Sequence, residues 1–239
     1  MKKSCLFLVL AALVAWTAEG RAEGETYPTD RYGFISHWLC LLEPFPMPDF
    51  GWYNDPGAYE KSRESAADKE FFPGMKTCTP KEGDKVKLDE KDQKNLADFW
   101  NTNPSDNKSS PGEERTWRAN HEDGYRNYLP PRHNAMYLVV TYIVCTEEMP
   151  GVRLKAGIGD FGTYLLNGKE VIRALKKAQM TMIDAYTSEP VTLKKGVNVL
   201  MAELLNGYGG YDIGVCARFV DKDDKPVTNI KISLTPPVK

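Results

Sequence analysis

The 239-residue sequence has little of the side-chain chemistry that most enzymes require. It holds three histidines, His37, His121 and His133, which lack the spacing of helical zinc ligands. It contains no Gly-x-Ser-x-Gly nucleophile elbow. The glycine-rich stretch from Gly207 to Gly210 lacks the Lys-Ser/Thr that follows in a phosphate-binding loop. We therefore expect no enzyme activity. A glycan-acting enzyme is the less favoured alternative, because the separation of two catalytic carboxylates is a spatial property that sequence does not give.

An excess of basic residues is also absent. The formal net charge of the whole chain is −2, from 31 basic and 33 acidic residues. Without residues 1–22 the charge becomes roughly −4. A nucleic-acid-binding protein would present a basic patch or stripe, so we expect no nucleic-acid partner.

A single long apolar run occurs, and it lies at the N-terminus. Lysines at positions 2 and 3 precede an apolar stretch from Cys5 to Ala15, which is short for a bilayer-spanning helix. This pattern predicts a signal peptide over residues 1–22, cleaved after Ala22, with Ala18 to Gly20 offering a second cleavage position. An anchoring helix is the alternative, and the charges at Glu19 and Arg21 disfavour it. We expect a secreted or periplasmic protein with no membrane span.

Cysteines are few, and their number is informative. Without the predicted signal peptide, Cys40, Cys78, Cys145 and Cys216 remain. An even number in an exported chain favours two disulfides, for which three connectivities exist and the sequence selects none. Buried free thiols are the alternative.

Short strand-like segments make up much of the sequence after the predicted signal peptide. Asn167-Gly168 stands between two apolar runs and predicts a hairpin, because both residues tolerate the positive φ of a type I′ turn. Along the 211–220 strand, period two places Tyr211, Ile213, Val215, Ala217 and Phe219 on one face and Cys216 and Arg218 on the other. Expected strands cover residues 34–42, 85–88, 115–119, 136–145, 152–156, 161–166, 191–193, 197–204, 211–220 and 230–234.

Residues 23–239 are therefore expected to form one all-β sandwich domain. Residues 49–111 have too little apolar content for an independent domain. They predict a helical and loop insertion packed on the sandwich. Helices are expected over 59–71, starting near Pro56, and over 89–100. Residues 173–188 are ambiguous, with one or two helical turns expected.

The order of several motifs resembles a known family. A first strand ends in Trp38 to Phe45, and a Gly-Glu-Glu-Arg-Thr-Trp block follows at 112–117. The strong strand at 136–144 precedes Leu-Asn-Gly-Lys at 166–169, then Leu-Lys-Lys-Gly-x-Asn-x-Leu at 193–200. A Gly-Tyr-Gly-Gly loop then leads into an Ala-Arg-Phe strand. This order is similar to galactose-binding-domain-like jelly-roll modules, which are carbohydrate-binding-module-like domains of secreted bacterial proteins.

The resemblance covers residues 35–45 and 112–222 and leaves 49–111 unmatched. It implies a jelly-roll β-sandwich that binds carbohydrate. One departure concerns a turn at which related modules often carry Asp-Asp-Gly. This chain has Gly159-Asp160-Phe161-Gly162 there, so one acidic side chain is missing.

Sugar recognition needs a flat apolar face for the C–H groups of the ring, and amides or carboxylates for its hydroxyls. Trp38, Trp100 and Trp117 are expected in the core instead. For the loop-borne Tyr208, burial and exposure are equally favoured, because glycines surround it. The candidate ligand-binding residues are Trp52, Tyr53, Tyr208 and Tyr211 for the apolar face, and Asp160, Asn206 and Asp212 for the hydroxyls.

No cofactor is expected. A structural Ca²⁺ is the exception that stays open, because such an ion is common in sandwiches of this kind. Asp221 to Asp224 predicts a hairpin turn rather than a calcium loop. The expected function is that of a non-catalytic exported module that binds carbohydrate or a cell-surface polymer. The alternative is a structural or assembly subunit of a cell-surface or secreted complex, with its sheet faces or residues 49–111 as the protein interface.

Overall fold

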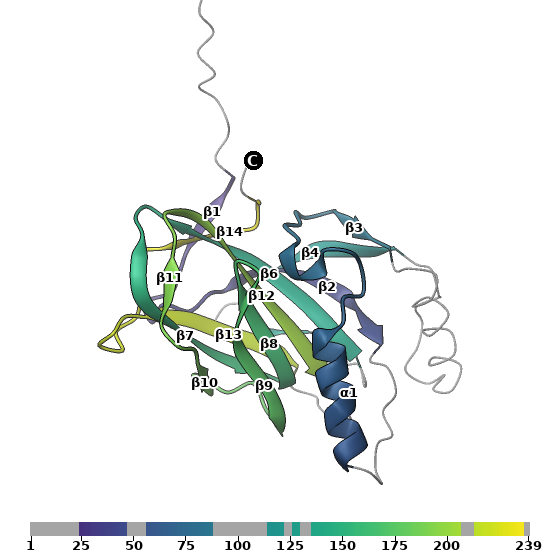
Figure 1. Cartoon of the computed structure of the whole chain (residues 1–239). Helices are drawn as coiled ribbons and strands as arrows, with labels where there is room; N and C mark the ends of the chain where they lie inside the picture. The colour runs from purple at the N-terminus through teal and green to yellow at the C-terminus, as the bar shows by residue number, and fades with distance from the viewer. Residues whose placement is uncertain are drawn as a thin grey trace, which may run out of the picture.

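The computed structural model describes residues 24–46, 56–87, 114–121, 126–129, 135–206 and 213–236. Within these ranges the chain is built mainly of strands, with one α-helix and one 3-10 helix (Figure 1). The elements are β1 (Thr26–Pro28), β2 (His37–Pro46), α1 (Pro56–Asp68), η1 (Met75–Thr77), β3 (Lys85–Val86), β4 (Arg115–His121), β5 (Asn127–Tyr128), β6 (Ala135–Cys145), β7 (Met149–Ile158), β8 (Asp160–Leu166), β9 (Lys169–Gln179), β10 (Tyr186–Thr187), β11 (Val191–Leu193), β12 (Gly196–Asn206), β13 (Gly214–Val220) and β14 (Lys231–Ser233).

The strands form two antiparallel sheets. The nine-stranded sheet has the order β3-β4-β2-β6-β12-β8-β9, with β14 also paired to β6 and β1 paired to β14. The five-stranded sheet has the order β10-β7-β13-β5, with β11 also paired to β7. The expected all-β sandwich is therefore correct at the level of fold class. No helix in the described ranges is long and apolar enough to cross a membrane.

The main core lies between the two sheets and is built by strand alternation. Leu200, Ala202 and Leu204 of β12 point into it, as do alternate residues of β13. The predicted face of that strand is confirmed from residue 213 onward, since Ile213, Val215, Ala217 and Phe219 all belong to the core. Tyr211 lies outside the described residues. Cys216 and Arg218 fall on the opposite face.

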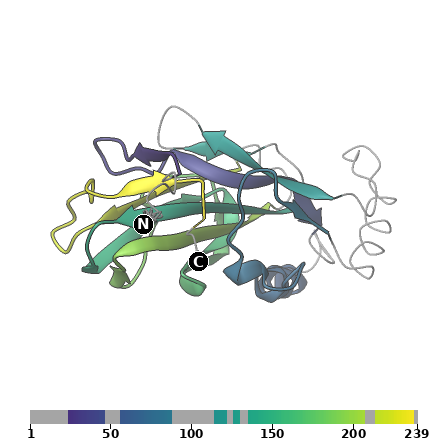
Figure 2. The same cartoon turned by 90° about the horizontal axis from the view of Figure 1, so that it is seen from above.

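A second core covers the outer face of the nine-stranded sheet. Residues 56–80, here called the covering segment, place α1 and η1 against that face (Figures 1 and 2). Ala66, Phe71 and Met75 of this segment share a buried cluster with Leu138 and Met201 of the sheet. Helix α1 begins at Pro56, as expected for a proline at the first helical position. The helix predicted over 89–100 lies outside the described residues.

Two expectations about local structure are wrong. Strand β2 does not stop before its prolines but continues to Pro46, with a shift in register between Leu41 and Phe45. Such an irregularity tolerates residues that lack a ladder donor. Residues 173–179 form no helical turn, because β9 continues to Gln179 alongside β8. Ala174 and Leu175 are buried in different cores, as consecutive residues of a strand should be.

The Asn167-Gly168 hairpin is confirmed. Both residues have positive φ, 53° and 78°, as a type I′ turn requires. The Asn167 side chain also fixes the turn to β12, because its Oδ1 accepts a hydrogen bond from the Val199 N–H at 2.9 Å. Its Nδ2 donates to Asn198 Oδ1 at 2.9 Å.

Asn167→Ala should lower the free energy of unfolding by about 2 kcal/mol, because the substitution removes two hydrogen bonds and disfavours positive φ. Urea denaturation measures this loss. Asn167→Gly is the matched variant, since it removes the same bonds but keeps the φ, and should lose less. Equal stability of Asn167→Ala and the wild type would contradict the assigned role.

Candidate functional site

The structure places two of the seven predicted ligand-binding residues. Asp160 begins β8 and Asn206 ends β12. The other five, Trp52, Tyr53, Tyr208, Tyr211 and Asp212, lie outside the described residues.

Asp160 and Asn206 lie at the same end of the nine-stranded sheet. Leu205 and Phe161 form the end pair of β12 and β8, so Asn206 and Asp160 each come one residue beyond that pair. The backbone of Asp160 is left-handed there, with a φ of 55°. On its other side Asn206 pairs with Ala135, which belongs to the core between the sheets. Directly opposed residues point to the same face, so the fully buried Asn206 side chain faces the space between the sheets.

Asn127 reaches the same space from the opposite sheet. It pairs with Val215 in β13, and Val215 faces the core. Asn127 is 1% exposed, and neither its Oδ1 nor its Nδ2 has a hydrogen-bond partner within the described part of the chain. A buried amide that lacks partners costs about 1–3 kcal/mol, so these two atoms are unusual enough to need an explanation.

Gln179 and Thr181 complete this end. Gln179 pairs with Asp160, and its buried Nε2 has no acceptor among the residues that the structure describes. The Gly214 carbonyl accepts hydrogen bonds from the Gly159 N–H at 3.0 Å and from Thr181 Oγ1 at 3.4 Å. These bonds hold the start of β13 against the turn before β8.

We call Asn127, Asp160, Gln179 and Asn206 the polar end. Sequence reasoning found Asp160 and Asn206 but missed Asn127 and Gln179, because neither stands in a motif. Primary amides donate and accept hydrogen bonds at once, so this set suits neutral ligands that carry hydroxyl groups. Asp160 is the one carboxylate of the polar end, so these four residues hold no acid–base pair of carboxylates.

No group of three or more His, Cys, Asp or Glu side chains in the described ranges is arranged to hold a metal ion. His37 and His121 nonetheless lie opposite each other in β2 and β4, with ring centroids 5.5 Å apart. Tyr27 stacks on His37 at 3.8 Å. Burial, and then the neighbouring His121, lowers the pKa of His37. His133 lies outside the described residues.

One buried carboxyl group stands apart from the polar end. Glu203 pairs with Leu138, which belongs to the outer core, so the side chain lies beneath the covering segment. Its Oε2 accepts a hydrogen bond from Thr163 Oγ1 at 2.6 Å, whereas its Oε1 has no partner among the described residues. Burial raises the pKa of Glu203 to about 7, and the Thr163 bond opposes this shift in part.

The four cysteines carry free thiols, contrary to the favoured expectation of two disulfides. They occupy three layers of the molecule. Cys40 and Cys145 are in the core between the sheets, Cys78 is in the covering segment, and Cys216 is on the outer face of β13. Cys40 pairs with Val139, six residues from Cys145 along β6. That is about 20 Å at the rise of a strand, well beyond disulfide reach.

Four free thiols should therefore react with a thiol reagent when the protein without residues 1–22 is denatured in the absence of reductant. Mass spectrometry after alkylation counts them. A chain that takes up four alkyl groups agrees with the structure, and one that takes up none would restore the two-disulfide expectation. Cys78 should react slowly in the native protein, because burial raises the pKa of its thiol to about 12.

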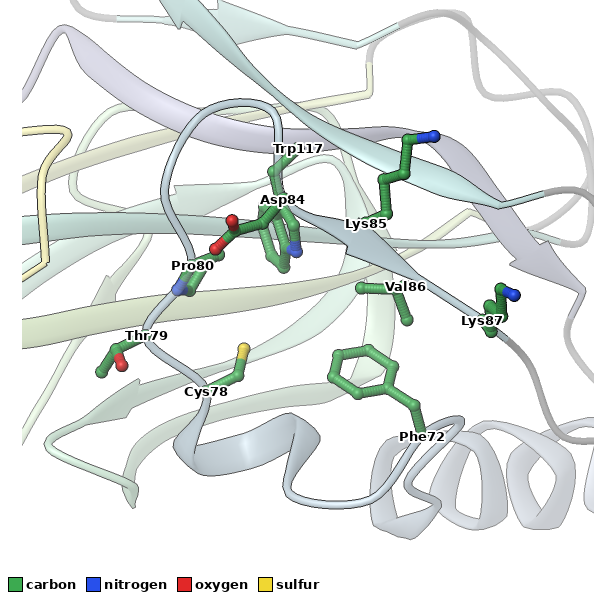
Figure 3. Close-up of a pocket in the computed structure, with 9 residues that line it drawn as sticks. All are labelled: Phe72, Cys78, Thr79, Pro80, Asp84, Lys85, Val86, Lys87 and Trp117. Carbon is green, nitrogen blue, oxygen red and sulfur yellow. The ribbon is translucent and has the colours of Figure 1, made fainter.

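A groove opens elsewhere, between the covering segment and strands β3 and β4 (Figure 3). Its volume is 340 Å³. It lies on the outer side of the nine-stranded sheet, whereas the polar end lies between the sheets. Trp117, expected as a core residue, is 1% exposed and forms part of this groove. The groove is lined by Phe72, Cys78, Thr79, Pro80, Asp84, Lys85, Val86, Lys87 and Trp117.

Comparisons with known proteins identify no family. No protein-family model matches the sequence, and no curated protein gives a significant match. Among solved structures, a β-glucosidase from Kluyveromyces marxianus in complex with glucose aligns with 53% of this chain and 15% of its own, at 18% identity and a TM-score of 0.30. The alignment thus spans a small part of that enzyme, and at this TM-score it carries no argument about fold or function.

Proposed function

We propose that this protein is an exported, non-catalytic jelly-roll module that binds carbohydrate or another hydroxylated surface polymer at the polar end. The observation that carries the proposal is the buried Asn127 amide, with both polar atoms unpartnered in the described structure and Asp160 and Asn206 at the same end of the sandwich. The proposed export rests on the signal-peptide pattern of residues 1–22.

The chemistry of a sugar fits these groups. Each hydroxyl donates one hydrogen bond and accepts others, and so does each amide. A bound sugar would satisfy the Asn127 amide and the Gln179 Nε2, for which the described residues provide no partner. The candidates for the apolar face are close in sequence, because Asn206 ends β12 and six residues separate it from Ile213. Tyr208 and Tyr211 lie within those six residues.

A glycan array tests the proposal with wild type, Asp160→Asn and Tyr208→Ala. We expect retention of a defined glycan class by the wild type. We expect loss of about tenfold or more in affinity for each variant, since each removes a hydrogen-bonding charge or a stacking ring. Asp223→Asn, in an exposed turn remote from the polar end, should bind as the wild type does. Background retention of the wild type on all glycans would reject the proposal.

A second candidate function is that of a structural subunit acting through protein contacts. One observation favours it: Met180, Met182 and Ile183 form an exposed apolar stretch after β9, exposed by 66%, 52% and 42%. Clustered exposed apolar side chains are typical of interaction surfaces. Size-exclusion chromatography with light scattering tests it on the wild type and on Met182→Gln. An oligomer that dissociates in the variant supports this function, and a strict monomer with glycan affinity rejects it.

A further inference from the structure

The groove between the covering segment and β3 has the composition of a small-molecule site. Its volume of 340 Å³ lies near the lower end of the range for ligand pockets, about 300–1,000 Å³. Phe72, Pro80, Val86 and Trp117 supply apolar and aromatic walls. None of these residues belongs to the polar end, so the groove is independent of the proposed carbohydrate site.

The floor of the groove carries a hydrogen-bond donor that no described residue accepts from. Figure 3 shows the Trp117 indole with its nitrogen directed toward the space between Val86, Phe72 and Cys78. The backbone of Trp117 is fully used, because its N–H donates to the Asp84 carbonyl and its carbonyl accepts from the Gly83 N–H, both at 2.9 Å. No acceptor in the described part of the chain meets the indole N–H of this buried residue. A ligand oxygen placed there would accept a hydrogen bond from the Trp117 indole N–H.

The groove wall carries negative charge. The Asp84 side chain is half-buried, and its Oδ2 accepts a hydrogen bond from the Lys81 N–H at 3.0 Å, which fixes the carboxylate at the turn before β3. Figure 3 places this carboxylate beside the Trp117 ring. Aromatic faces attract cations, and a carboxylate next to one strengthens the attraction.

The two lysines of the groove do not cancel this charge. The Glu114 carboxylate forms ion pairs with Lys85 Nζ at 2.8 Å and with Lys87 Nζ at 3.4 Å. In Figure 3 the ammonium groups of both lysines point away from the groove. The Cys78 thiol adds no charge, because it stays protonated at neutral pH. Among the described residues that line the groove, Asp84 is therefore the charged one that no ion pair neutralises.

We propose that this groove binds a small organic cation, a protonated amine on a flat apolar body with one oxygen acceptor. The ammonium group pairs with the Asp84 carboxylate. The flat body lies between Phe72 and Trp117, and the oxygen accepts a hydrogen bond from the Trp117 indole N–H.

Tyramine and tyrosol test this proposal as a matched pair, because they share the phenol ring and differ in carrying an ammonium group or a hydroxyl. The titration follows the Trp117 indole N–H by NMR at pH 7 on the full domain. We expect saturable binding of tyramine that is about tenfold tighter than binding of tyrosol, the typical gain from one charge-assisted contact. Absence of saturable tyramine binding, or equal affinities for the two probes, would overturn the proposal.

Asp84→Asn should remove the tenfold preference, while the remaining Oδ1 still accepts the hydrogen bond that fixes the turn. Asp223→Asn removes a carboxylate from an exposed turn and should keep the preference. A second measurement needs no variant: 0.5 M NaCl should weaken tyramine binding and leave tyrosol binding unchanged, because salt screens the charge pair. A preference that survives in Asp84→Asn, or that salt does not reduce, assigns the charge recognition to other groups and rejects the proposal.

Discussion

Glu203→Gln should raise the free energy of unfolding by about 3 kcal/mol at pH 8 and leave it nearly unchanged at pH 4.5. The reason is the raised pKa of the wild-type carboxyl, about 7 in the folded protein against an ordinary 4.5. One pKa unit corresponds to about 1.4 kcal/mol, so the difference amounts to about 3 kcal/mol once the folded group is fully ionised.

The sign follows from proton uptake. Between pH 4.5 and 7 the unfolded chain has released the Glu203 proton while the folded chain retains it. Stability of the wild type therefore falls as pH rises through this window, and the full loss is reached above pH 7. Glutamine cannot ionise, and its oxygen can still accept the hydrogen bond from Thr163 Oγ1.

Urea unfolding of both proteins from pH 4 to 9 measures the effect. The matched control is Glu148→Gln, at an exposed position after β6, which should follow the wild type at every pH. Parallel stability curves for the wild type and Glu203→Gln would show that Glu203 ionises normally. They would also show that the covering segment does not exclude water from this carboxyl.

Asn127→Leu should stabilise the protein and abolish glycan binding. The wild-type amide is buried and has no partner for either atom in the described structure, so an apolar side chain of similar shape recovers about 1–3 kcal/mol. The same substitution removes the donor and acceptor that a sugar would use. Thermal unfolding and retention on the glycan identified by the array measure the two effects.

Thr141→Val is the matched control for this prediction. Thr141 is buried in the same core, and its Oγ1 has no partner in the described residues, but it lies in the middle of β6, away from the polar end. The variant should gain stability and keep glycan binding. If Asn127→Leu gains stability and still binds glycan, the amide is a structural imperfection and the proposed site is wrong.

The sequence predicts strands well where a local signal exists. Alternation along residues 213–219 and the Asn167-Gly168 turn correspond to real side-chain faces and dihedral angles. It fails at β9, where pairing with β8 decides the structure against a locally helical-looking stretch. It also fails at Pro44 and Pro46, which a register shift allows to stay in β2. In both places tertiary pairing outweighs local preference.

In the candidate site, too, some residues carry a local sequence signal and others depend on tertiary pairing. Asp160 and Asn206 could be named from the sequence because they flank recognisable turns. Asn127 could not, because its importance comes from pairing with Val215, 88 positions away, and from an amide that no described residue partners. The favoured disulfides failed for a related reason, since an even number of cysteines carries no information about which layer each thiol occupies.

An NMR titration that follows side-chain amide protons during addition of a retained glycan tests the central claim most directly. We expect saturable shifts of the Asn127, Gln179 and Asn206 amide signals, while the Trp117 indole N–H in the separate groove stays unchanged. Shifts confined to the Trp117 indole and its neighbours, with the three amides unmoved at saturation, would contradict the assignment of carbohydrate binding to the polar end.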